Sequence, residues 1–260
     1  MGTAIEMRNV SVVQDGARIL DSIDLSIDEG ENIAIIGPNG SGKTTLMKLL
    51  RGEIRPYSCE DTVFRLFGKD RWDLFGLRSM IGMVSMDLQS RFDGNSSVND
   101  VALSGFFGSM DIYRNHEVNE TMKEKVRKIG ETMGLTDKMD RNIGTVSLGE
   151  MRRALISRAL VHGPEMLVLD EPMTGLDVNV RTTFKKMFDS LIANGTSIVM
   201  ITHELEDIPD GIGRIIMIKN GKIFADGEKK KLLTSENISR LYDTDLKVDR
   251  RGGSYHMYGA

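Results

Sequence analysis

Hydrophobic and polar positions alternate along the first thirty residues, and this pattern predicts short strands separated by turns. The two partly apolar stretches cover residues 5–13 and 19–27. Each is followed by a turn signal, Asp15-Gly16 after the first and Glu29-Gly30 after the second. An acidic residue followed by glycine favours a tight turn, so the chain is expected to begin with paired strands.

A continuous apolar run at residues 32–36 predicts a buried strand. The run ends at the glycine-rich segment 37–42, and a helical pattern follows from about residue 44 to residue 51. Gly52 is a helix stop signal, so the predicted order is strand, glycine-rich turn and helix.

The middle of the chain, residues 88–162, lacks β-branched runs and has apolar residues at helical spacing. Residues 120–133 form one predicted helix, which ends at Gly134. Residues 151–162 form another, which ends at Gly163 and Pro164. This segment is expected to be a helical insertion.

Strand signals return after the insertion. Apolar runs at residues 166–169 and 197–201 flank a helical stretch at 180–193, and this alternation predicts a parallel sheet. Asn220-Gly221 then separates two further runs, 214–219 and 222–225, as in a hairpin.

The predicted organisation is one domain. Its α/β core comprises residues 1–87 and 163–233, and residues 88–162 form the helical insertion. The tail, residues 234–260, has helical spacing as far as residue 242 and no clear pattern afterwards.

The amino-acid composition and net charge argue against several classes of function. The chain has 260 residues and a net charge of −4, which argues against nucleic-acid binding through bulk positive charge. The single cysteine, Cys59, cannot form an internal disulfide, and this favours a reducing compartment. The first residues lack the pattern of a signal peptide, and no run of 18 apolar residues predicts a membrane span.

A phosphate-binding motif occupies the predicted turn between strand and helix. Its residues fit the pattern G-x-x-x-x-G-K-[ST] and are Gly37, Pro38, Asn39, Gly40, Ser41, Gly42, Lys43 and Thr44, with Thr45 next. Glycines let backbone N–H groups curl around phosphate oxygens, and the helix N-terminus adds partial positive charge. Lys43 is expected to reach the β- and γ-phosphates, and the Thr44 hydroxyl is suited to ligate Mg²⁺.

Two carboxylates, Asp170 and Glu171, follow the apolar strand 166–169. Open α/β sheets bind ligands at the carboxyl ends of their strands. Asp170 is therefore suited to hold the Mg²⁺ shell, and Glu171 is suited to accept a proton from an attacking water. By itself, the pair would also fit a strand that runs into an acidic loop.

The order and spacing of these motifs resemble the nucleotide-binding subunit of ABC transporters over essentially the whole chain. Residues 146–150 (VSLGE) resemble the family's signature loop, and residues 174–177 (TGLD) resemble its D-loop. Glu171 directly follows the Walker B aspartate, as in the family. His203, which follows the apolar strand 197–201, resembles the switch histidine.

The resemblance implies a P-loop NTPase core of the RecA-like type, with a mainly parallel sheet, an antiparallel β subdomain and an inserted helical subdomain. It also implies an ATPase that works as a head-to-tail pair, with ATP between the phosphate loop of one copy and the signature loop of the other. The implied signature contacts are Ser147, Leu148, Gly149 and Glu150. His203 would contact the γ-phosphate from the same copy as Lys43, across from the signature loop of the other copy. Asp177 would connect the two sites, and Glu171 would activate water.

The sequence departs from the family at three places. The signature loop has Leu148 and Glu150 where glycine and glutamine are usual. The Q-loop run ends in Met86, a poor Mg²⁺ ligand, so Gln89 is the candidate for that ligand, with a surface glutamine as the alternative. Residues 12–18 lack the aromatic that usually stacks on adenine, which leaves Val13 and Arg18 as candidate contacts and predicts relaxed base selectivity.

The implied partners are a second copy or a homologous ATPase subunit, transmembrane permease subunits and a substrate-binding protein, without nucleic acid. The chain would lie on the cytoplasmic face of a membrane and power an importer. An ABC ATPase acting on ribosomes or DNA is the alternative. The family docks permeases beside residues 86–110, where Phe92, Phe106 and Phe107 are either contacts or insertion core. The basic runs 229–231 and 250–251 are expected to be solvated. Met80, Met83 and Met86 are expected to pack in the core or on a subunit surface.

Overall fold

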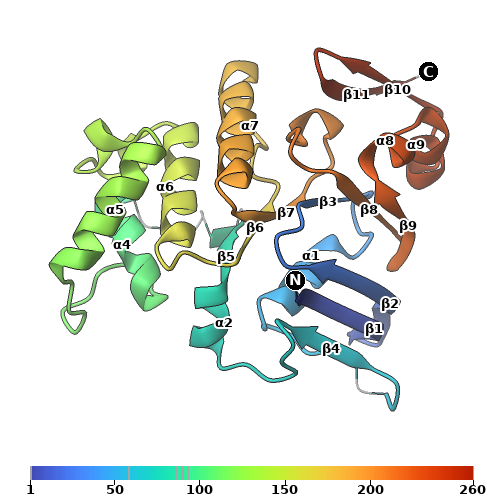
Figure 1. The fold of residues 1–260 in the computed structure, drawn as a ribbon, viewed down its shortest axis with the longest axis horizontal. Helices are drawn as coiled ribbons and strands as arrows, with labels where there is room; N and C mark the ends of the chain where they lie inside the picture. Colours follow the sequence, from blue (N-terminus) through green and yellow to red (C-terminus); the bar gives the residue numbers. More distant parts are fainter. Residues whose placement is uncertain (1, 58, 86, 89–90, 93, 260) are drawn as a thin grey trace.

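The computed structural model describes residues 2–57, 59–85, 87–88, 91–92 and 94–259, and their strands form three sheets. A three-stranded sheet has the order β2-β1-β4, a six-stranded sheet has the order β5-β6-β7-β3-β8-β9, and β10 and β11 form a hairpin. Figure 1 shows the six-stranded sheet at the centre, with the three-stranded sheet below it and a lobe of helices at the left. The predicted α/β core with a helical insertion is confirmed.

The N-terminal sheet is antiparallel. Strand β1 (Thr3–Gln14) pairs with β2 (Ala17–Asp28) on one side and with β4 (Val63–Leu66) on the other. Asp15 and Gly16 both have positive φ, 50° and 79°, which is the geometry of the tight hairpin turn that the sequence predicted. Strand β4 was not predicted, because its four residues (VFRL) show no alternation of apolar and polar positions.

The central sheet is parallel except at one edge. Its strands in spatial order are β5 (Ile81–Val84), β6 (Met166–Asp170), β7 (Ser197–Ile201), β3 (Ile33–Ile36), β8 (Arg214–Lys219) and β9 (Lys222–Glu228). Only β9 runs antiparallel, and it is joined to β8 by the predicted Asn220-Gly221 turn. Strands β3 and β6 each have four consecutive buried side chains. This pattern arises because helices or another sheet cover both faces of the central sheet.

Among the described residues, five α-helices belong to the core and three to the insertion. The core helices are α1 (Lys43–Leu50), α2 (Leu74–Met80), α7 (Val178–Ala193), α8 (Lys229–Leu232) and α9 (Ser235–Tyr242). The insertion helices described are α4 (Val98–Leu103), α5 (Glu120–Thr132) and α6 (Leu148–Leu160). In Figure 1 the lobe of α4, α5 and α6 stands beside α7 at one end of the central sheet.

Capping side chains fix where the long helices begin. Asn119 accepts a hydrogen bond from Met122 N at the start of α5, and Asp177 accepts two at the start of α7. Helix α6 begins with a capping box formed by Ser147 and Glu150, so it starts three residues earlier than the sequence predicted.

Two large apolar clusters lie on the two faces of the central sheet. One cluster joins the sheet to α6 and α7, and it contains the edge-to-face pair Phe184 and Phe188. The other joins the sheet to α1 and the N-terminal sheet. Met80 and Met83 pack against this second cluster, as predicted, while Met86 lies outside the described residues.

The C-terminal tail differs from its prediction. After α9, β10 (Leu246–Arg251) pairs with β11 (Ser254–Gly259) around Gly252 and Gly253, which both have positive φ. Each strand is only partly buried, so the apolar alternation that would have signalled it is weak.

One basic residue was also predicted wrongly. Lys230, Lys231, Arg250 and Arg251 are exposed as expected, but Lys229 is buried. Its ammonium donates to Pro209 O at 2.8 Å, and burial lowers the pKa of Lys229 to about 8.

None of the described helices combines the length and the apolar content that a crossing of the bilayer requires.

Truncation of Phe188, a core side chain on α7, should show how much the packing of this helix on the sheet contributes to the free energy of unfolding. Phe188→Ala is expected to lower the free energy of unfolding by about 3–5 kcal/mol, because the ring is fully buried and its removal leaves a cavity. Val178→Ala on the same helix, where the side chain is 76% exposed, should change it by less than about 0.5 kcal/mol. Urea unfolding of both variants checks this, and equal effects would contradict the assigned burial.

Candidate functional site

The predicted phosphate loop connects β3 to α1, so the strand–loop–helix context is confirmed. Glycine is required at two positions by close packing. A Cβ at Gly37 would lie 2.1 Å from Ile218 O, and a Cβ at Gly42 would lie 2.6 Å from Leu20 Cδ2. Gly42 also has a φ of 107° as the N-cap of α1, a conformation that favours glycine. The loop is therefore wedged between the N-terminal hairpin and the end of β8.

Lys43 is buried inside this loop. Its Nζ donates to Gly37 O at 2.6 Å and to Pro38 O at 2.9 Å. Burial lowers the pKa of Lys43, while the charges of Glu171 and Asp170 act in the opposite direction. The hydroxyl of Ser41 is buried without a hydrogen-bond partner among the described residues, whereas Thr44 is exposed. A buried cation and a buried hydroxyl that has no partner among the described residues thus lie in this loop, which fits an anionic ligand.

Asp170 and Glu171 stand at the carboxyl end of β6, as predicted. Burial raises the pKa of Asp170, the charge of Glu171 raises it further, and Lys43 is the first of the cations that oppose this. Glu171 has a φ of 48°, which is rare for a residue with a side chain. Its N–H donates to Ile201 O at 2.8 Å on the neighbouring strand, so the unusual backbone is held by the sheet.

His203 lies directly beside Glu171. The two residues follow the adjacent parallel strands β7 and β6, and His203 Nδ1 is 3.0 Å from Glu171 Oε1. Thr174 Oγ1 donates to the other oxygen, Glu171 Oε2, at 3.2 Å. The structure therefore brings together Lys43, Asp170, Glu171 and His203 at one edge of the sheet.

Sequence reasoning missed Arg152, the largest of the fully buried side chains, with 0% exposure. It projects from α6 and donates through Nη1 to Glu171 O at 3.5 Å. Burial lowers the pKa of Arg152, and the carboxylates of Asp170 and Glu171 oppose that shift. A signal was available, because Arg152 shares a helical face with the apolar residues Leu155 and Ile156, where a solvated arginine is not expected.

The signature-like residues form the first turn of α6 on the helical insertion. Ser147 Oγ accepts from Glu150 N at 3.3 Å, and Glu150 Oε2 accepts from Ser147 N at 2.8 Å. Leu148 is 37% exposed, and Gly149 packs so closely on Val180 that a Cβ would lie 2.9 Å from Val180 Cγ1. This turn is thus seated on the start of α7.

Asp177 occupies the N-cap of α7 next to that turn. Its Oδ1 accepts from Asn179 N at 2.9 Å and from Val180 N at 3.0 Å. The signature-like turn and the D-loop-like segment are therefore neighbours. A Cβ at Gly175 in the D-loop-like segment would lie 3.4 Å from Leu148 Cδ2 in the signature-like turn.

The candidate adenine contacts pair across the N-terminal hairpin. Val13 and Arg18 are register partners near its tip, and Arg18 Nη1 binds Asp21 Oδ1 at 2.7 Å. Tyr57, which sequence reasoning did not consider, is exposed beside them and donates its N–H to Ser11 O at 2.7 Å.

The remaining predicted residues are the Q-loop candidate and the three phenylalanines proposed as permease contacts or insertion core. Gln89, like Met86, lies outside the described residues. Phe92 and Phe106 are half-buried and pack against apolar clusters, and Phe107 stacks on His116 with ring centroids 4.1 Å apart.

Comparisons with known proteins agree with this geometry. A family model described as "ABC transporter" matches residues 20–174. The chain is 36% identical over 250 residues to the uncharacterized ABC transporter ATP-binding protein YlmA of Bacillus subtilis, covering 94% of this chain and 92% of that protein. It is 32% identical to the zinc uptake system ATP-binding protein ZurA of Listeria innocua, covering 95% and 93%. The solved structure of cbiO1 from Clostridium perfringens, part of the transporter complex cbiONQ, superposes with a TM-score of 0.77 at 25% identity, covering 92% and 94%.

The hairpin tip lacks an aromatic side chain of its own, so discrimination between purine bases is expected to be weak. We expect kcat/KM for ATP to exceed that for GTP by less than about 100-fold, which corresponds to about 2.7 kcal/mol. Steady-state hydrolysis of both nucleotides measures the ratio, and a larger preference would contradict the expectation.

Proposed function

The chain belongs to the ABC transporter family of ATP-binding subunits, and from this premise we propose that it powers an importer as a head-to-tail pair of two copies. It is an ATPase whose hydrolysis drives transport. The observation that carries the proposal is the pairing of Glu171 with His203 at 3.0 Å, beside the buried Lys43 and at the carboxyl ends of parallel strands.

Residues 37–45 are suited to hold the triphosphate. The Nζ of Lys43 is bonded to two loop carbonyls, and an entering phosphate oxygen offers it a charge-assisted partner instead. The hydroxyl of Ser41 in the same loop is buried without a hydrogen-bond partner among the described residues. The N-terminus of α1 adds its partial positive charge.

The residues present also fit Mg²⁺, a cation that prefers oxygen ligands. The exposed Thr44 hydroxyl would ligate it directly, Asp170 would act through a water, and Gln89 is a further candidate. When bound, the ion neutralises charge on the phosphates.

Glu171 is the proposed general base. Its left-handed backbone turns the side chain away from the strand direction, and His203 and Thr174 hold one oxygen each. A carboxylate so fixed can orient a water for attack on the γ-phosphate. His203 then contacts the γ-phosphate, and Arg152 supports the Glu171 backbone from behind.

The other half of each site is proposed to come from the second copy. Ser147 and the Gly149 backbone lie at the N-terminus of α6, where partial positive charge favours a phosphate. Leu148 and Val178 expose apolar surface on either side of Asp177, which suits contact with another protein. Glu150 holds the loop by its capping bonds.

The names of relatives support the proposed partners and direction of transport. ZurA serves zinc uptake and cbiO1 is part of the complex cbiONQ, so we infer permease subunits and import for this chain, with a substrate-binding protein outside. The chain would then lie on the cytoplasmic face of the membrane. The permeases would dock beside residues 86–110.

Glu171→Gln tests the catalytic assignment. The amide keeps the shape of the side chain but cannot accept a proton, so hydrolysis should fall by about 10²–10⁴-fold while ATP still binds. ATP should then trap the pair, which gel filtration detects as a dimer. A monomer at saturating ATP, or full turnover, would contradict the mechanism.

Ser147→Asn separates capping from nucleotide contact. Asparagine is as good an N-cap as serine, so stability should stay within about 0.5 kcal/mol, whereas Ser147→Ala should lose about 1 kcal/mol. Both variants lack the hydroxyl, and both are expected to lose hydrolysis. An Asn variant with normal turnover, measured beside thermal unfolding, would show that Ser147 is only a cap.

A further inference from the structure

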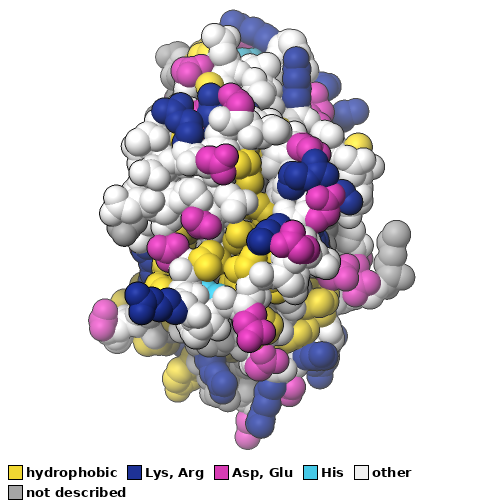
Figure 2. Space-filling model, turned by 90° about the vertical axis from the view of Figure 1, so that its left-hand side faces the viewer, with side chains coloured by type: hydrophobic (Ala, Val, Ile, Leu, Met, Phe, Trp, Pro, Cys, Tyr) yellow, Lys and Arg dark blue, Asp and Glu magenta, His cyan; other side chains and the backbone are white. Residues whose placement is uncertain are grey.

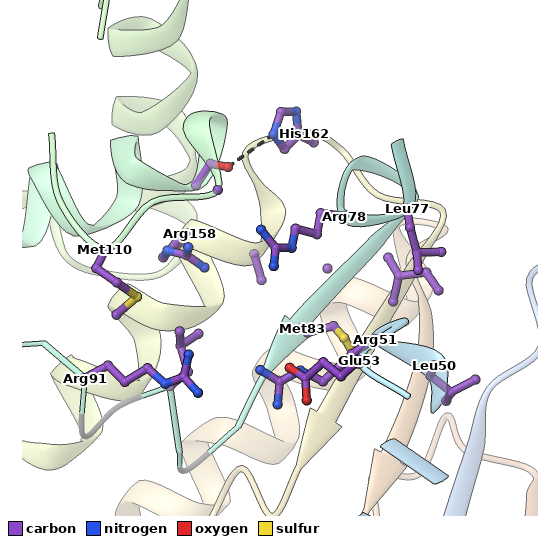
Figure 3. Close-up of a pocket in the computed structure, with 16 residues that line it drawn as sticks. Leu50, Arg51, Glu53, Leu77, Arg78, Met83, Arg91, Met110, Arg158 and His162 are labelled. Carbon is purple, nitrogen blue, oxygen red and sulfur yellow. Dashed lines mark hydrogen bonds and ion pairs between the residues drawn. The ribbon is translucent and has the colours of Figure 1, made fainter. Parts of the chain in front are cut away.

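Two features of the structure lie away from the phosphate loop. One is a cavity of about 150 Å³ between the core and the insertion, into which Arg78, Arg91 and Arg158 point (Figure 3). The face at that end of the molecule has apolar side chains between charged ones (Figure 2), and it belongs to the region where permeases are proposed to dock. The other is the hairpin of β10 and β11, which lies at the opposite end of the molecule, next to α8 and α9 (Figure 1).

The hairpin packs against the segment that follows His203. This segment, residues 204–213, connects β7 to β8, and its turn Leu205–Asp207 lies beside β11. Glu206 Oε1 accepts a hydrogen bond from His256 Nδ1 at 2.8 Å, because an ionised carboxylate can only accept. The hairpin is thus bonded to the chain close behind the histidine that is proposed to contact the γ-phosphate.

The rest of the segment is held by α8 and by α7. Pro209 O accepts from the buried ammonium of Lys229 at 2.8 Å, and Asp207 Oδ1 accepts from Arg181 Nε on α7 at 2.7 Å. The Lys229 ammonium also lies over the ring of Tyr255 in β11, 5.9 Å from the ring centroid. Strand β11 therefore contacts the segment directly and also through Lys229.

The hairpin itself contributes little to the hydrophobic core. Among its described residues, only Tyr255 is buried. Polar contacts attach the hairpin instead, since Ser254 Oγ accepts from Lys185 Nζ at 2.5 Å, and the N–H groups of Leu246 and Val248 donate to serine hydroxyls of α9. A satisfied polar network of this kind rigidifies the groups that it joins.

Helix α9, which leads into the hairpin, is also close to the site. The hydroxyl of Tyr242 is buried without a hydrogen-bond partner among the described residues. Burial, and to a smaller extent the charges of Glu204 and Glu171, raise the pKa of Tyr242 to about 12. The C-terminal tail is therefore within electrostatic reach of the proposed catalytic carboxylate.

The position of the His203 ring depends on the segment 204–213. Its Nδ1 lies 3.0 Å from Glu171 Oε1, and its Nε2 lies 3.6 Å from Glu204 Oε1. Glu204 belongs to the segment, and its N–H donates to Thr202 Oγ1 at 3.0 Å. A shift of this backbone moves the ring relative to Glu171, and a misplacement of about 1 Å at a reacting centre can lower a rate by about 100-fold.

We propose that His256 is a positioning residue for ATP hydrolysis, which holds Glu206 and thereby keeps His203 in contact with Glu171. The inference rests on the proposed roles of Glu171 and His203, and it adds an element that sets their geometry. His256 acts on the reaction through the segment 204–213, without contact to the reacting groups.

Hydrolysis kinetics of His256→Ala and Glu206→Ala test the inference. Each change should lower kcat by about tenfold and alter KM for ATP by less than about twofold, because it leaves the phosphate loop intact. The double variant should be no slower than either single variant, since both changes remove the same contact. His256→Gln, whose amide can donate to Glu206, should recover most of the lost kcat.

Arg251→Ala is the matched control. Arg251 is an exposed residue of the same hairpin, and its ion pair with Asp249 does not reach the segment 204–213, so this variant should keep its kcat. Melting temperatures of all the variants verify that they are folded.

A second measurement reports on His203 itself. The chain has four histidines, so their ring signals can be resolved and assigned by nitrogen NMR. Glu206→Ala, which keeps all four, should shift the His203 signal and leave those of His116 and His162 unchanged. An unaltered kcat in both single variants, an additive loss in the double variant or an unmoved His203 signal would overturn the inference. Full hydrolysis by Glu171→Gln would instead overturn the catalytic assignment on which it rests.

Discussion

The parallel register of β6 with β7 is the constraint on which the site depends. It pairs Asp170 with Ile201, and it lets the Glu171 N–H bond to Ile201 O although Glu171 has left-handed backbone geometry. Such a conformation costs roughly 1–3 kcal/mol, so it persists only where the surroundings hold it. Here the sheet, the His203 ring and the Arg152 side chain all act on this one residue. The carboxylate is therefore fixed before any ligand arrives.

The buried charges around that residue stabilise one another. Lys43 and Arg152 each lose solvation, which lowers their pKa values, and the carboxylates of Asp170 and Glu171 partly compensate them. Loss of one member would leave another buried and unpaired, which costs more than the pair contributes. The two cations come from opposite lobes, Lys43 from the start of α1 and Arg152 from α6. The acidic strand end thus joins the core to the helical insertion electrostatically as well as by packing.

Sequence alone predicted the parts whose chemistry is local. The phosphate loop and the acid pair at the end of β6 depend on a few consecutive residues, and their structural context is as expected. The contact of Arg152 with Glu171, the place of Tyr57 and the burial of Lys229 were not predicted, because each depends on elements far apart in the chain. The C-terminal hairpin was missed for a related reason, since its strands are too exposed to show an apolar pattern. The roles assigned to the site residues remain predictions.

Helix α6 links the surfaces that the sequence had treated separately. Ser147 caps its first turn, Arg152 reaches Glu171 from its buried face, and Arg158 near its end donates to Ser104 Oγ and Ser109 O. A capped helix of 13 residues packed on both sides moves as a rigid element rather than by local bending. The Ser147 turn and the contact between Arg152 and the Glu171 carbonyl therefore belong to one packed helix. Helix α6 thus connects the signature-like turn of the insertion to the backbone of Glu171 in the core.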